Sequence, residues 1–132
     1  MDAEVGVGAG PGGSAAAYWL ASAGLKVALL EKRALGRDKV CGDGVAPHAM
    51  DVLAALGVGV AELAAGTGPV TTLRLVSPMG TQTRRSFARP VSVIPRVLLD
   101  ARLVHAARNT GAVFERHRVR TLSQQDGTVL VD

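Results

Sequence analysis

Three glycines near the start of the chain have the spacing of a phosphate-binding turn. Gly8, Gly10 and Gly13 fit the pattern G-x-G-x-x-G, with a short apolar segment before them and an alanine-rich segment after them. In this pattern the first glycine permits a sharp turn, the second lets the backbone approach a pyrophosphate, and the third lets a helix pack closely on a strand. The N–H groups and the dipole of that helix would then face the phosphates.

An acidic residue lies where nucleotide recognition needs one. Glu31 follows Gly8 by roughly 20 residues, at the end of a second apolar run, where a carboxylate can accept hydrogen bonds from a ribose hydroxyl pair. An acid at this place favours an unphosphorylated ribose. A glycine-rich turn that binds nothing is the plain alternative in a chain with 16 glycines. The turn, its flanking segments and the acid together predict a bound adenosine diphosphate, which NAD and FAD share.

A strand, a helix and a second strand must position these residues. We predict a strand over residues 3–7, a helix over 14–23 that Gly24 stops, and a strand over 26–31. The second strand has a continuously apolar centre, which is typical of a parallel strand buried on both faces. The sequence therefore predicts a βαβ unit with a right-handed crossover.

The rest of the chain continues as a mixture of helices and strands. Residues 32–47 are charged and aperiodic, and we predict a long loop of the functional kind. We predict helices over 49–56 and 97–107, strands over 73–76, 82–87, 113–115, 119–122 and 128–131, and turns at 78–80 and 126–127. The predicted fold class is α/β, a Rossmann-like FAD/NAD(P)-binding domain with a β-meander.

Composition and charge narrow the function further. The net charge is +4, but the basic residues are scattered and aromatic residues make up only 3% of the chain, so nothing supports nucleic-acid binding. The single cysteine fits a reducing compartment, and the 3 histidines have no ligand spacing, so we predict no metal site. The acidic start and the lack of a long apolar run predict a cytoplasmic protein, with peripheral membrane contact left open.

The segment after the second strand separates NAD from FAD. An NAD dehydrogenase would normally continue with a helix, whereas here a basic loop runs from Lys32 to Gly44. A loop of this kind can wrap back over the rest of a dinucleotide. It therefore favours FAD.

Four segments carry a resemblance to a known family. They are VGAGPGGSAAA at 7–17, LEKR at 30–33, DKVCGDG at 38–44 and PRVLLDARL at 95–103. With them the sequence resembles the geranylgeranyl reductase family of flavoproteins, which is related to the aromatic-hydroxylase type of FAD enzymes. The likeness spans nearly the whole chain, and it implies an FAD-dependent oxidoreductase.

The resemblance also implies cofactor contacts beyond the glycine turn and Glu31. The basic loop would lie along FAD, the arginine that begins the last helix would contact the cofactor, and two further backbone groups would meet the pyrophosphate and the adenine. The residues concerned are Lys32, Cys41, Gly42 and Gly44 in the loop, Arg96, Gly12 at the pyrophosphate and Val119 at the adenine. The plain alternatives are a cysteine that is only a small hydrophobe and an arginine that is only solvated. No catalytic residue is assigned.

The implied reaction is reduction of carbon–carbon double bonds in an isoprenoid chain such as a geranylgeranyl group. Reduced flavin would deliver hydride, and NADPH or another donor would reload it. An FAD-dependent monooxygenase or halogenase is a second interpretation, and a catalytically inactive nucleotide-binding fragment is a third. Family members carry a later Gly-Asp segment and a substrate domain, which we do not find before Asp132. We therefore expect residues 1–132 to be an incomplete, N-terminal FAD-binding domain without turnover of its own. The sequence does not identify the substrate, the electron donor, the oligomeric state or the redox activity of Cys41.

Overall fold

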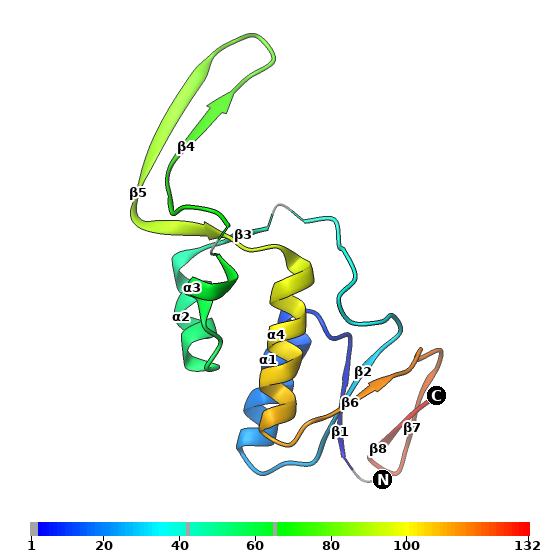
Figure 1. Ribbon diagram of the computed structural model, residues 1–132. Helices are drawn as coiled ribbons and strands as arrows, with labels where there is room; N and C mark the ends of the chain where they lie inside the picture. Colours follow the sequence, from blue (N-terminus) through cyan, green and yellow to red (C-terminus); the bar gives the residue numbers. More distant parts are fainter. Residues whose placement is uncertain (1–2, 42, 65) are drawn as a thin grey trace. The chain divides into compact units, whose positions relative to one another are not determined.

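The chain divides into two units that each pack internally. The computed structural model describes residues 3–41, 43–64 and 66–132 (Figure 1). One unit contains the chain up to Asp38 together with Val97–Asp132, and the other contains Lys39–Arg96. Each unit is described by itself below.

The first unit is built on a parallel sheet. Its strands are β1 (Glu4–Val7), β2 (Val27–Glu31) and β6 (Val113–Arg116), in the order β1-β2-β6. Every residue of β2 is buried, as its apolar run predicts for a central parallel strand. Helix α1 (Pro11–Ser22) connects β1 to β2, so the predicted βαβ unit is confirmed.

Small side chains hold two helices close to this sheet. Helix α4 (Arg96–Asn109) joins α1 in a buried cluster around Leu29, which is only 1% exposed. Alanines of both helices take part in this cluster, with Ala17 from α1 and Ala107 from α4 both buried. Their short side chains allow the helix backbones to approach the sheet closely.

A hairpin ends the first unit. Strands β7 (Leu122–Gln125) and β8 (Thr128–Val131) pair in antiparallel fashion around Asp126 and Gly127, both of which have positive φ. Such a pair of left-handed residues is what a two-residue hairpin turn requires, so the predicted turn is confirmed. The predicted strand over 119–122 is misplaced, because Val119 lies in the connection before β7. Pairing across the hairpin reaches only as far as the backbone hydrogen bond from Arg120 to Asp132.

The second unit is a small antiparallel sheet with two helices. Its elements are β3 (Gly44–Val45), α2 (Pro47–Ala55), α3 (Val60–Leu63), β4 (Val70–Val76) and β5 (Gln82–Val93), with the strand order β3-β5-β4. The loop predicted over 32–47 therefore ends early, at β3 and at a helix that starts on Pro47. Proline is favoured at the first helical position, where its missing N–H is not needed, and Pro11 starts α1 in the same way.

The observed architecture confirms the predicted α/β class, with a parallel, helix-connected sheet and antiparallel hairpins. Within the ranges that the structure describes, no helix is long and apolar enough to cross a membrane.

Candidate functional site

The glycine turn has a steric reason for two of its three glycines. Gly8 has a φ of +99°, in the left-handed region that side chains rarely adopt, and its N–H donates to the Leu30 carbonyl at 2.7 Å. A Cβ on Gly13 would stand 2.0 Å from the Gly8 carbonyl oxygen, a distance that no real Cβ contact shows. The strand and the helix can therefore meet this closely only with glycine at position 13.

The start of α1 offers N–H groups to an outside acceptor. The N-cap is Gly10, which provides no side-chain hydrogen bond, and Pro11 has no N–H to satisfy. The helix makes its first backbone bond from Ser14 N–H to the Gly10 carbonyl, at 3.0 Å. The backbone N–H groups that precede Ser14 at the start of α1 have no acceptor within the helix, as is usual for a first helical turn. Gly12 is exposed, and a Cβ there would meet nothing within 4 Å, so the structure has room at this helix end for an anionic group such as a pyrophosphate.

Glu31 is hydrogen-bonded directly to the glycine turn. Its carboxylate accepts a hydrogen bond from the Ala9 N–H at 3.1 Å through Oε2 and one from the Arg33 N–H at 3.1 Å through Oε1. The residue is only 7% exposed. Because each carboxylate oxygen can accept two hydrogen bonds, acceptor capacity is left for a ribose hydroxyl. The acid that the sequence places near the turn thus also holds the turn in position.

The surroundings of Glu31 keep it ionised. Burial by itself raises the pKa of Glu31, but the backbone N–H groups of Arg33 and Ala9 lower it, and so do the charges of Arg37 and Lys32. The net effect is a pKa below the ordinary value. A charged carboxylate is the stronger acceptor for a hydroxyl donor, so this charge suits the proposed ribose contact.

The residues that the sequence singles out fall in both units. The first unit contains the glycine turn, Glu31, the exposed Lys32 and the half-buried Val119, and the second contains Cys41, Gly44 and Arg96. Gly44 is the first residue of β3 and pairs with Val93. Gly42 lies outside the described residues. The cofactor contacts predicted for all of these residues stay predictions.

Inside the second unit, Asp43 organises the neighbourhood of Cys41. Asp43 is one of two non-glycine residues with positive φ in the described chain, at 52°. Its carbonyl accepts the Ile94 N–H at 2.8 Å, and its carboxylate accepts the Arg96 N–H at 3.3 Å. Hydrogen bonds from the Asp43 backbone and the Arg96 side chain, with the Arg96 charge, lower the pKa of the exposed Cys41 thiol. This loop therefore brings together two of the predicted site residues, Cys41 and Arg96.

Sequence reasoning missed three contributors to these sites. Ala9 acts through its N–H, which any residue type supplies, so no sequence signal marks it. Asp43 acts through a left-handed backbone that aspartate tolerates better than most residues, and its place between two glycines is the only hint. Ser14 directly follows the glycine motif, and its completely buried Oγ has no hydrogen-bond partner in the described structure.

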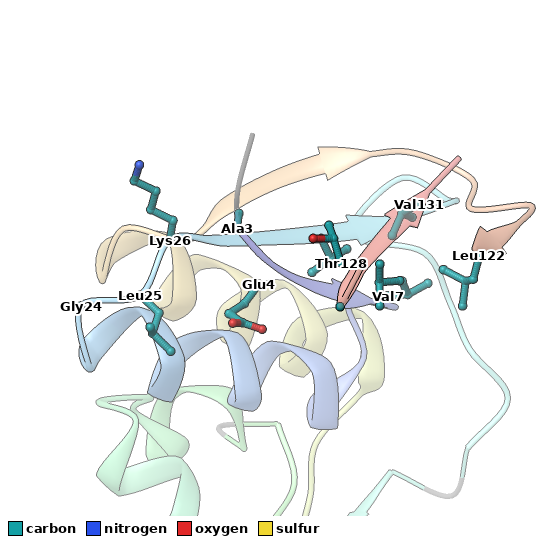
Figure 2. A pocket seen from close by; sticks show the side chains of 12 residues that line it. Ala3, Glu4, Val7, Gly24, Leu25, Lys26, Leu122, Thr128 and Val131 are labelled. Atoms are coloured by element: carbon teal, nitrogen blue, oxygen red, sulfur yellow. The ribbon is translucent and has the colours of Figure 1, made fainter. Parts of the chain in front are cut away.

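A cavity of about 800 Å³ lies elsewhere in the first unit, between β1 and the β7–β8 hairpin (Figure 2). Val5 and Val7 line it from β1, and Leu122 and Val131 line it from the hairpin. None of the described residues predicted to hold a cofactor is among its lining residues. In the described part of the chain, no cluster of histidine, cysteine or acidic residues could hold a metal ion.

Comparison with known proteins finds an FAD-binding family and two proteins named as reductases or reductase-like. A family described as FAD binding domain matches residues 3–131. A menaquinone reductase of Mycobacterium tuberculosis is 39% identical over an alignment that covers 92% of this chain and 33% of the relative. A crystal structure of a geranylgeranyl bacteriochlorophyll reductase-like protein from Thermoplasma acidophilum has a TM-score of 0.76 at 25% identity, over 96% of this chain and 34% of that one.

A flavin-dependent brominase shares the fold. It has a TM-score of 0.81 at 21% identity, with 95% of this chain and 31% of the brominase covered. The chain thus spans about a third of the length of each of these relatives.

Proposed function

Because the chain belongs to the FAD binding domain family, we propose that it binds FAD with the glycine turn after β1 and with Glu31 after β2. The family comprises FAD-dependent oxidoreductases and monooxygenases. The observation that carries the proposal is the hydrogen bond from Ala9 N–H to the Glu31 carboxylate, because it places the acid beside the turn. A pyrophosphate at α1 and a ribose at Glu31 are therefore within reach of one adenosine diphosphate.

The chain's own groups divide the binding between them. Backbone N–H groups of Gly10, Gly12 and Gly13 would hold the pyrophosphate, where the helix dipole favours negative charge. Glu31 would accept from the ribose hydroxyls. Lys32, Cys41, Gly42, Gly44, Arg96 and Val119 complete the proposed set of contacts along the cofactor. When bound, FAD supplies the hydride chemistry, and the protein orients the ring and tunes its surroundings.

For the reaction, we propose reduction of carbon–carbon double bonds in an isoprenoid chain. Two of the relatives above are named as reductases or as reductase-like, and one of those names contains the geranylgeranyl group. NADPH or another reductant would reload the flavin, in the cytoplasm. The 132-residue chain would contribute the cofactor-binding portion of such an enzyme, without turnover by itself.

A flavin-dependent monooxygenase or halogenase is the alternative reaction. The brominase favours it, since that protein has the same fold over 95% of this chain. The DKVCGDG loop around Cys41 favours the reductase. Sequence beyond Asp132 would distinguish the two, because this chain matches only about a third of the length of each relative.

Flavin uptake tests the cofactor proposal. The purified chain, refolded with FAD and then desalted, should keep a yellow colour and quench the flavin fluorescence. A fragment that binds only adenine nucleotide would bind ADP but release all flavin on desalting, and tight binding of NAD without flavin uptake would refute the FAD assignment.

A further inference from the structure

The β4–β5 hairpin of the second unit carries an unbalanced positive charge. No aspartate or glutamate occurs between Glu62 and Asp100 in the sequence. Among the arginines in this interval, Arg89 forms an ion pair with Asp51 at 2.6 Å. The outer half of the hairpin contains Arg74, Arg84 and Arg85, all of them exposed.

The pairing register places like charges opposite each other, which destabilises the hairpin by itself. Arg74 lies directly across from Arg84, and Arg85 lies across from Leu73. Like charges in directly opposed positions destabilise an antiparallel pair. Because side chains alternate between the faces of a strand, Arg74 and Arg84 extend from one face and Arg85 from the other. The hairpin is therefore surrounded by positive charge on both faces, which an external anion would neutralise.

The end of the hairpin is apolar. Met79 in the turn is 95% exposed, and Leu75 and Val76, the last residues of β4, are 55% and 51% exposed. Figure 1 shows β4 and β5 running together as a long ribbon that ends in this turn. Apolar side chains at the tip with arginines just behind them match the layering of a membrane interface, where acyl chains lie beneath charged headgroups.

We propose that the β4–β5 hairpin docks end-on to an anionic lipid surface. Met79 and Val76 enter the interface, and Arg74, Arg84 and Arg85 contact headgroup phosphates. Charge complementarity identifies the partner, since the three arginines have opposite charge to anionic headgroups. A nucleic-acid partner is less well matched, because the outer half of the hairpin, residues 73–86, contains no aromatic side chain on which bases could stack, and Phe87 behind it is half-buried. This inference goes beyond the proposed function, because docking requires no flavin.

Vesicle binding tests the proposal. The flavin-free 132-residue chain should sediment with vesicles of equal parts phosphatidylcholine and phosphatidylglycerol, but not with phosphatidylcholine alone, and high salt should release it. Each basic residue near such a surface strengthens partitioning by about fivefold, so the variant with Arg74, Arg84 and Arg85 all changed to Gln should bind about 100-fold more weakly. Changing Met79→Ser should weaken binding severalfold.

A matched control separates the hairpin from net charge. Changing Arg108, Arg118 and Arg120 to Gln removes the same charge from exposed positions of the first unit, and it should leave vesicle binding nearly unchanged. Equal weakening by the two triple variants would overturn the proposal. So would an absence of binding to the anionic vesicles, or binding of a single-stranded oligonucleotide instead.

One further variant separates the loss of positive charge from any loss of hairpin stability. Arg84→Glu places an acid opposite Arg74, and opposite charges in that position stabilise a strand pair. This variant should keep or raise the thermal stability while weakening vesicle binding by about 25-fold, because two positive charges are lost. Unchanged vesicle binding by folded Arg84→Glu protein would refute docking through this hairpin. FAD binding should be unaffected by every hairpin variant, so the two proposals fail independently.

Discussion

Replacing Gly13 with alanine should destabilise the fold, whereas the same change at the preceding residue should not. A Cβ at position 13 would stand 2.0 Å from the Gly8 carbonyl oxygen, so α1 and the end of β1 would have to separate by about an ångström. At Gly12 the added Cβ meets nothing within 4 Å. The two positions are neighbours in one helix and receive the same methyl group, so the comparison isolates the contact.

Helix propensity and steric overlap have opposite effects on the free energy of unfolding. Alanine improves helix formation over glycine by up to about 1 kcal/mol at either position. Forcing extra volume into a packed contact costs about 1–3 kcal/mol and sometimes more, and here the contacted atom belongs to the backbone, which cannot move aside as a side chain does. We expect Gly13→Ala to lower the free energy of unfolding by about 2 kcal/mol, and Gly12→Ala to leave it unchanged or raise it by up to about 1 kcal/mol.

Urea unfolding followed by far-ultraviolet circular dichroism measures both changes. FAD binding provides a second readout, since a methyl group on Gly12 would occupy the space proposed for the pyrophosphate. Gly12→Ala should therefore stay folded but bind FAD more weakly than the parent. Equal stability of the two variants would show that the close approach of helix and strand is not what position 13 requires.

Three further predictions concern Glu31 and Cys41. Glu31→Ala should lower the free energy of unfolding by about 2 kcal/mol in urea titrations, because the hydrogen bonds that Ala9 and Arg33 donate to a charged group are lost. The folded-state pKa of Glu31 is lowered, so its stabilising effect should be complete above the ordinary carboxyl pKa and disappear as the pH falls through the lowered value. Urea titrations of the parent and Glu31→Gln at a series of pH values should therefore converge at acidic pH; a gap that persists there would contradict the assignment. Changing Arg96→Gln should slow iodoacetamide alkylation of Cys41 near neutral pH and move its pH midpoint upward, whereas an equal rate in the two proteins would show that the Arg96 contact does not lower the thiol pKa.

The βαβ unit is predictable from the sequence because its causes are local. The apolar run of β2, the glycine spacing and the alanines of α1 each favour their observed structure within a few residues. The sequence predicts a start of α1 at residue 14, but the helix begins at Pro11, since proline is well suited to the first helical position.

The second unit is less predictable because its strands depend on distant partners. Strand β3 has two residues, too few to show any alternation, and it forms because Gly44 and Val45 pair with Val93 and Ser92. Strand β5 extends to Val93 through Pro90, beyond the prediction that ended at residue 87, and the register shifts along this stretch. Proline suggests a strand end when only the local sequence is considered, but it is tolerated beside a bulge.

The sequence predicts that Glu31 lies near the glycine turn, but it does not predict which groups its carboxylate contacts. The spacing from Gly8 to Glu31 predicts an acid beside the turn, because Gly8 directly follows β1 and Glu31 is the last residue of the adjacent parallel strand β2. It does not predict that the carboxylate binds the Ala9 N–H, since backbone donors carry no residue signature. The left-handed Asp43 that contacts Arg96 was missed for a similar reason, because its role depends on backbone conformation.

Competitive flavin binding tests the central claim most directly. Fluorescence titration of the purified chain with FAD, with and without ADP, should give one saturable site from which ADP displaces the flavin, and Glu31→Ala should weaken FAD and ADP binding in parallel. FAD binding that ADP does not affect, or that Glu31→Ala leaves unchanged, would contradict an adenosine diphosphate site at the glycine turn and Glu31.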